Sequence, residues 1–171
     1  MKPLNVFVTV VAALLMLFAG CKPAAIQQAE DNKQVFLRSI DAINSKNFEA
    51  LNDLGIVNFV RHCQATPDVK VNSLEDFKNY LRQDSATFPD SRMTIDHVVA
   101  EGNFVAFHGT YAATQEGQMG PFPPSNRQMS IEIAGVQRFE NGKVAEMWVT
   151  WDNLSALAQL GYFPPPTQER K

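Results

Sequence analysis

Residues 136–161 constrain the fold of this chain more than any other segment. Apolar and polar residues alternate on both sides of Asn141-Gly142, a dipeptide that is typical of tight hairpin turns. A helical stretch over residues 153–160 follows and meets Gly161, a residue common just after a helix end. The segment therefore predicts two antiparallel strands joined by a tight turn, and then a helix.

The order of the elements before this hairpin indicates the fold class. Apolar residues recur at helical spacing at about residues 31–45, 47–54 and 73–88, where we expect helices, and we expect residues 56–62 to be extended. From Met93 onward they alternate as in strands, with a Gly- and Pro-rich loop at residues 115–126. This order predicts an α+β fold in which a curved antiparallel sheet wraps over N-terminal helices.

The turn at Asn141-Gly142 decides which side chains share a face of the sheet. A two-residue turn would pair Phe139 with Val144 and mix charged and apolar residues on both faces. A three-residue turn with Gly142 in a bulge pairs Phe139 with Lys143 and separates the faces, so we favour it. The inner face would then carry Met129, Ile131, Ile133, Gly135, Gln137, Phe139, Ala145, Met147, Val149 and Trp151.

Residues 1–20 are typical of a secretory signal peptide, because Lys2 precedes an apolar run that is short for a membrane span. The run ends in Phe18-Ala19-Gly20-Cys21, which resembles a bacterial lipobox. Cys21 would then be lipidated and become the mature N-terminus, holding the protein to a membrane. The alternative is an ordinary signal peptide with an incidental cysteine. Because Lys22 is not aspartate, the resemblance to lipoproteins implies the outer membrane, facing the periplasm, in a bacterium with two membranes.

We expect a tether over residues 21–30, a folded domain over 31–163 and a Pro-rich disordered tail over 164–171. Without residues 1–20 the chain has 14 basic and 18 acidic residues, a formal charge of −4, so we expect no nucleic-acid partner. Cys63 is the one cysteine left if Cys21 is acylated, which excludes an intramolecular disulfide.

Several short motifs together resemble a known family. They are Phe88-Pro89-Asp90, VAEGNFV at residues 99–105, PPSNR at 123–127, FENGKV at 139–144, the ending with Trp148, Asp152 and Gln159-Leu160-Gly161, and FVRH at 59–62. In this order they resemble the SnoaL-like polyketide and ester cyclases of the nuclear transport factor 2-like superfamily. The resemblance implies a cone-shaped α+β fold with a pocket between the helices and the concave sheet, and no cofactor.

The resemblance also implies where chemistry would occur. Family cyclases use a pocket carboxylate as general acid/base for an aldol step, in a Glu-His-Trp-Asp motif on the last strand. The corresponding residues here are Glu146, Met147, Trp148 and Val149. If so, Val149 and Met147 stand where the Asp and His would be, and neither can transfer a proton.

Two other residues are candidates for an acid/base role. His62 matches a family position whose histidine tends to line the pocket, although it could equally be a surface residue at a strand end. Asp152 could be a displaced catalytic acid, but we favour a helix N-cap because its predicted face points away from the pocket. His97 and His108 lack the carboxylate or cysteine spacing of a metal site, so we expect no metal. We expect Cys63 to be a buried apolar residue.

The sequence leaves three functions open. The first is a membrane-anchored lipoprotein whose pocket binds a small, mostly apolar molecule. The second is a cyclase-like or hydrolase-type enzyme that uses His62 or Asp152, and the third is a dimer that associates through its sheet with Trp148 as an anchor. The residues expected to line the pocket, unless the aromatic ones are simply core, are His62, Phe59, Phe107, Tyr111, Ile133, Gly135, Gln137, Met147, Val149 and Trp151.

Overall fold

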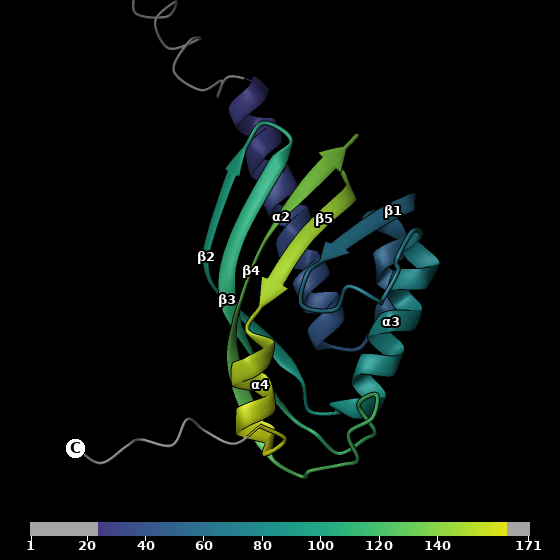
Figure 1. Cartoon of the computed structure of the whole chain (residues 1–171). Coiled ribbons are helices and arrows are strands. Elements are labelled where there is room, and N and C mark those ends of the chain that lie inside the picture. The colour runs from purple at the N-terminus through teal and green to yellow at the C-terminus, as the bar shows by residue number, and fades with distance from the viewer. Residues whose placement is uncertain (1–23, 164–171) are drawn as a thin grey trace, which may run out of the picture.

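The computed structural model describes residues 24–163, which form a curved sheet folded over helices (Figure 1). The elements are α2 (Ala24–Asn44), the 3₁₀ helix η1 (Phe48–Asp53), β1 (Gly55–Cys63), α3 (Leu74–Thr87), β2 (Arg92–Glu101), β3 (Phe104–Thr114), β4 (Gln128–Glu140), β5 (Lys143–Trp151) and α4 (Asn153–Leu160). The predicted α+β class, with a curved sheet wrapped over helices, is confirmed, although β1 precedes α3 in the chain.

The five strands found among residues 24–163 lie in the order β1-β5-β4-β3-β2. Strands β2 to β5 are joined as antiparallel neighbours, as the alternation predicted. The edge strand β1 instead pairs in parallel with β5, with Arg61 opposite Met147. The first strand of the chain therefore lies beside the last, and this long-range pairing leaves no local pattern in the sequence.

The β4–β5 turn differs from the predicted three-residue turn. Asn141 and Gly142 both have positive φ angles, 51° and 74°, and form a two-residue turn that pairs Phe139 with Val144. The register then shifts, so that Arg138 lies opposite Glu146 and Ala145 is the extra residue of a bulge. Because the bulge follows the turn immediately, the predicted separation of the two faces is nevertheless correct.

Helix α2 begins at Ala24, so the prediction of an irregular tether was wrong for residues 24–30. Contacts with the β2–β3 turn support these early helical turns. Gln28 Nε2 donates to Asn103 Oδ1 at 2.6 Å, and the buried Asn32 donates to the Gly102 carbonyl at 3.1 Å. The predicted signal peptide, Cys21 and the predicted tail over residues 164–171 lie outside the described residues. No helix among residues 24–163 is long and apolar enough to cross a membrane.

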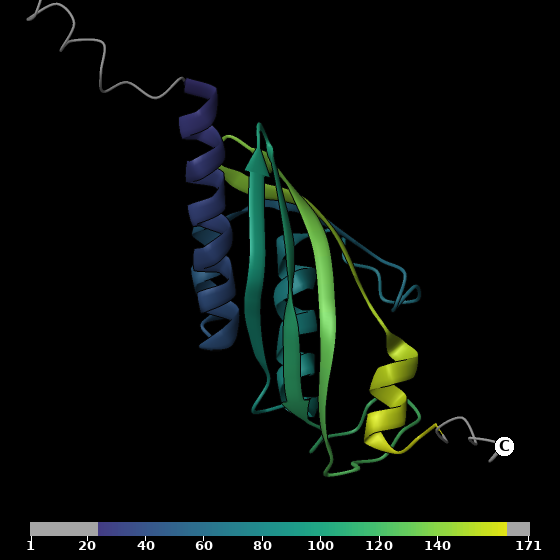
Figure 2. The same cartoon turned by 90° about the vertical axis from the view of Figure 1, so that its left-hand side faces the viewer.

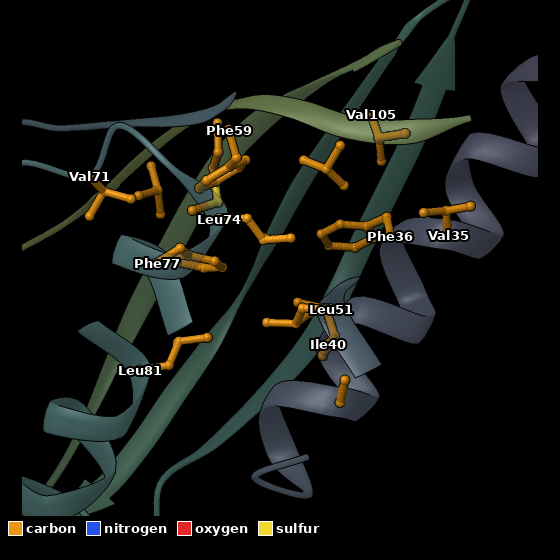
Figure 3. Packing of buried hydrophobic residues seen from close by; sticks show 14 of the residues in the cluster. Val35, Phe36, Ile40, Leu51, Phe59, Val71, Leu74, Phe77, Leu81 and Val105 are labelled. Atoms are coloured by element: carbon orange, nitrogen blue, oxygen red, sulfur yellow. The ribbon is translucent and has the colours of Figure 1, made fainter. Parts of the chain in front are cut away.

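The main core lies between the helices and the inner face of the sheet. Helix α2 runs along β2 and β3 (Figure 2), whereas α3 packs against β1 and η1. Figure 3 shows Phe36 and Ile40 of α2 and Leu74 and Phe77 of α3 extending into the same interior. A second, smaller core cluster contains Leu160 and holds α4 against β4. Helices α2 and α3 therefore cover the same face of the sheet and enclose the space beneath it.

Candidate ligand cavity

A cavity of about 1040 Å³ lies between α3, η1 and the inner face of the sheet. It extends to the loops at residues 65–69 and 118–122 and to helix α4. Apolar side chains make up most of its wall. Eight of the ten residues predicted to line a pocket lie on this wall, namely Phe59, Phe107, Tyr111, Ile133, Gln137, Met147, Val149 and Trp151.

The prediction that His62 lines the pocket was wrong. Its side chain lies on the outer face of the sheet, where Nε2 is 2.7 Å from Glu146 Oε1 and the ring stacks on Trp148 at 5.2 Å between centroids. Alternation along β1 explains the placement, because Phe59 and Arg61 are buried and His62 is exposed. The hydrogen bond from His62, with a smaller contribution from Arg138, lowers the pKa of Glu146.

Gly135 is the second predicted pocket residue that does not line the cavity. The Phe107 ring covers its inner face, since a Cβ atom at residue 135 would lie 2.8 Å from Phe107 Cε1 and 2.5 Å from the Trp148 carbonyl oxygen. The same ring stacks on Phe36, with centroids 5.0 Å apart. The glycine thus makes room for an aromatic contact between the sheet and α2.

Asp152 caps helix α4, the role favoured from the sequence. Its Oδ1 accepts hydrogen bonds from the backbone N–H groups of Leu154 at 2.9 Å and Ser155 at 3.1 Å. The residue is exposed and is absent from the cavity wall. Gly161 closes the other end of the helix in the left-handed conformation, with φ at 87°.

The cavity contains an acidic group that the sequence analysis missed. Asp84 of α3 lines the wall, and the Tyr111 hydroxyl of β3 donates to its Oδ2 at 2.8 Å. Desolvation raises the pKa of the Asp84 carboxyl above its usual value, although the Tyr111 hydrogen bond and the charge of Lys46 oppose this. Desolvation and the neighbouring Asp84 also raise the pKa of Tyr111. The pair can therefore hold a proton in an apolar setting at higher pH than an exposed carboxyl.

Two cations that are not exposed also line the wall and were missed. Lys46 donates from Nζ to the Ser91 carbonyl at 3.0 Å and to the Ser91 hydroxyl. Burial lowers the pKa of Lys46, while Asp84 and Asp90 oppose that effect. Arg61 is only 6% exposed and lies on the inner face of β1. The alternation that starts at Phe59 could have revealed Arg61, because it puts every second residue of β1 on the inner face.

Gln137 was predicted on the inner face of the sheet, and it lines the cavity there. Its Nε2 is 3.5 Å from Met147 Sδ, and its Oε1 has no hydrogen-bond partner among residues 24–163. The amide is therefore a polar group in a mostly apolar wall, with an acceptor that the described residues leave unpaired.

The remaining histidines, His97 and His108, and Cys63 do not line the cavity. His97 and His108 are neighbours on β2 and β3, with ring centroids 6.1 Å apart, and His62 is on the far edge strand β1. Within the described part of the chain, no three His, Cys, Asp or Glu side chains are grouped as metal ligands. Cys63 is partly buried beside the main core, as expected for a small apolar residue.

The curved sheet, the helices on one face and the apolar cavity between them define the cone-shaped nuclear transport factor 2-like class. A profile of SnoaL-like polyketide cyclases matches residues 33–160, and the chain belongs to this family. No curated protein sequence matches it significantly.

Solved structures show the same fold. IdmH of Streptomyces antibioticus is 26% identical, with a TM-score of 0.68 over 76% of this chain and 98% of its own. TsrD of Streptomyces laurentii is 23% identical, with a TM-score of 0.69 over 84% and 100% of the two chains. A SnoaL-like polyketide cyclase of Agrobacterium tumefaciens is 21% identical, with a TM-score of 0.63 over 76% and 98%.

Proposed function

We propose that this domain binds a small, mostly apolar molecule in the cavity. The observation that carries the proposal is the cavity itself, whose volume of about 1040 Å³ is at the upper end of the usual range for small-molecule sites. Its wall is largely apolar, with a few polar groups such as Asp84, Arg61 and Gln137. Met147 and Val149, which extend into it from β5, cannot transfer protons.

The test compares two substitutions on adjacent residues of β5. Val149 lines the cavity and Thr150 is exposed on the other face. We expect Val149→Phe to reduce the amount of small molecule that co-purifies with the protein, because the larger ring takes up part of the cavity beside β5. Thr150→Phe should retain it. Extraction followed by mass spectrometry measures the bound molecule, and thermal shift measures stabilisation by added apolar compounds. If no compound co-purifies and none stabilises the protein, the proposal fails.

We also propose that the domain is exported and anchored through a lipid on Cys21. The lipobox-like sequence supports this, and helix α2 begins at Ala24, the third residue after that cysteine. In Figure 1 the start of α2 is at the opposite end of the molecule from α4, one of the elements that the cavity reaches. An anchored domain would therefore hold the α4 end of the cavity away from the membrane.

Fractionation of cells tests the anchor with the two cysteines as a matched pair. Cys21→Ala should move the protein from the membrane fraction to the soluble fraction, and Cys63→Ala should leave it with the membrane. Mass spectrometry of the N-terminal peptide should show the acyl chains on Cys21. A protein that stays with the membrane after Cys21→Ala argues against the anchor.

A second candidate function is proton-transfer catalysis. The structure removes His62 and Asp152 from the cavity wall, but Asp84 supports this alternative because it is an acid in an apolar cavity, hydrogen-bonded to Tyr111. A carboxyl with a raised pKa suits general acid/base catalysis near neutral pH. If the protein is an enzyme, Asp84→Asn should abolish turnover of the molecule that it binds while leaving its affinity nearly unchanged. Undiminished turnover would exclude Asp84 from the chemistry.

Association through the sheet remains a third proposal. Trp148 lies on the outer face, as predicted, and is 39% exposed beside His62. An exposed Trp on a sheet face suits an interface. Light scattering after size exclusion would test it, and a dimer should become a monomer on Trp148→Glu.

A further inference from the structure

Arg61 is a fixed cation in the wall of the cavity. Its backbone pairs with Met147 of β5, and its N–H donates to the Val71 carbonyl at 3.1 Å. Its side chain is directed to the inner face with Phe59, and the residue is 6% exposed. Because both neighbouring segments hold the backbone, the side chain starts from a fixed place on the inner face.

Few groups satisfy this guanidinium within the described chain. Its one side-chain hydrogen bond is a long one, 3.3 Å from Nη1 to Thr66 Oγ1. Its Cζ lies 4.5 Å from the centre of the Tyr80 ring and 5.6 Å from that of Trp151. Cation–π contacts of this kind hold the charge but engage no N–H donor. The guanidinium carries five N–H donors, so most of them are left for a partner.

Arg61 also differs from other arginines of the domain in its charge environment. Arg82 contacts Glu49 and Glu75, and Arg138 contacts Glu140 and Glu146, all toward the outside. Among residues 24–163, no carboxylate oxygen lies within 4.0 Å of an Arg61 nitrogen. A buried charge without a counter-ion is costly, so such groups usually have a partner.

The inner part of the cavity has an excess of positive charge. Arg61 and Lys46 are both cationic groups of the wall, and Asp84 is the acidic group among them. A single carboxyl offsets at most one of these two positive charges. Asp68 and Arg92, which also line the cavity, are exposed, and their opposite charges cancel. A ligand with one negative charge would complete the balance.

We propose that the ligand is a monocarboxylate on an apolar chain or ring skeleton, and that Arg61 binds its carboxylate; this rests on the proposed function of the cavity. A carboxylate presents two oxygens in a plane, which match parallel N–H donors of a guanidinium. The apolar wall accommodates the remainder of the molecule. A phosphate monoester would bring nearly two charges into a mostly apolar site, where desolvation opposes it. The single buried guanidinium thus favours a monoanion.

Matched pairs of compounds test this directly. The probes are decanoate against 1-decanol and 2-naphthoate against 2-naphthalenemethanol, titrated by calorimetry into the full chain carrying Cys21→Ala. Each pair shares its apolar skeleton and differs in the carboxylate. We expect the acid to bind at least about tenfold more tightly than the alcohol, because a charge-assisted hydrogen bond in a desolvated site has about that effect.

Two arginine variants then locate the preference. Arg61→Met should reduce the ratio of acid to alcohol affinity to about one while the alcohols still bind. Arg138→Met removes the same charge from the outer face and should leave the ratio unchanged. If a folded Arg61→Met variant keeps the native ratio of acid to alcohol affinity, another group binds the carboxylate and the inference is wrong.

The outcomes separate this inference from the function on which it rests. Alcohols that bind the native chain as tightly as the acids overturn the carboxylate and leave cavity binding intact. If none of the four probes binds and nothing co-purifies, the binding function itself is refuted. Should Arg61→Met fail to fold, Arg61→Gln takes its place in locating the preference, and acids that bind the native chain no more tightly than alcohols still overturn the inference.

Discussion

The two substitutions Asp152→Ala and Asp152→Asn separate a structural role of Asp152 from a catalytic one. Oδ1 of Asp152 accepts hydrogen bonds from the N–H groups of Leu154 and Ser155 at 2.9 and 3.1 Å. These are two of the donors that the first turn of a helix leaves without an intrahelical partner. Alanine removes the acceptor, whereas asparagine keeps an oxygen in the same place.

The magnitude follows from exposure and from the geometry of the cap. Loss of an N-cap side chain destabilises by about 0.5–2 kcal/mol. Since Asp152, Leu154 and their surroundings are exposed, water can replace the lost acceptor, and we expect about 1 kcal/mol for Asp152→Ala. For a domain of this size that lowers Tm by about 3 °C. Asp152→Asn loses only a charge near the helix N-terminus and should cost less than about 0.5 kcal/mol.

Urea unfolding of the native chain and the two variants measures these differences. Amide exchange of Leu154 and Ser155 adds a local readout, because fraying of α4 should accelerate it in the alanine variant alone. Equal losses of stability in both variants would refute the capping argument. A stable Asp152→Asn variant that no longer turns over a substrate would show that Asp152 is catalytic after all.

Three other substitutions address the core, the buried acid and the outer histidine. Phe36 is fully buried, so Phe36→Ala should cost about 3–5 kcal/mol in urea unfolding, against under about 1 kcal/mol for the exposed Phe104→Ala; similar losses would contradict the core assignment. Burial raises the pKa of Asp84 above its ordinary 3.8, so the stability from its neutral form is present below that value and is lost as pH rises through the folded pKa. The stability of Asp84→Asn relative to the native chain should therefore increase with pH, and a constant difference in unfolding free energy would exclude the shift. His62→Ala should change the affinity of the cavity for a ligand less than about twofold and the free energy of unfolding by under about 1 kcal/mol, since the contact of His62 with Glu146 is on the surface. Loss of ligand binding in calorimetry would show that His62 belongs to the binding site.

The local patterns that predicted correctly depend on near neighbours in the chain. The faces of β4 and β5 followed from period-two alternation, and the predicted inner residues are the ones that face the core and the cavity. The helix ends at Asp152 and Gly161 followed from cap chemistry, which involves only the next few residues. The exact turn did not follow, since a bulge beside a two-residue turn gives the same faces as a bulge within a longer turn.

The polar groups of the cavity could not be assembled from such patterns. Asp84 is on α3 and Tyr111 on β3, so only the packing of that helix against the sheet brings their oxygens to 2.8 Å. Arg61 lay within reach of sequence reasoning, yet a motif match placed His62 in the pocket against the alternation of its own strand. The partner of β1 was equally hidden, because its pairing with β5 joins segments far apart in the chain.

The sequence by itself thus determined the α+β class, the hairpin, its two faces and the family, because these depend on periodicity and caps within a few residues. The tertiary structure alone decided which charges share the cavity. It joined Asp84 to Tyr111 and left no carboxylate oxygen within 4.0 Å of an Arg61 nitrogen among the described residues. Distances between side chains on separate elements depend on how those elements pack, and no local spacing in the sequence encodes them.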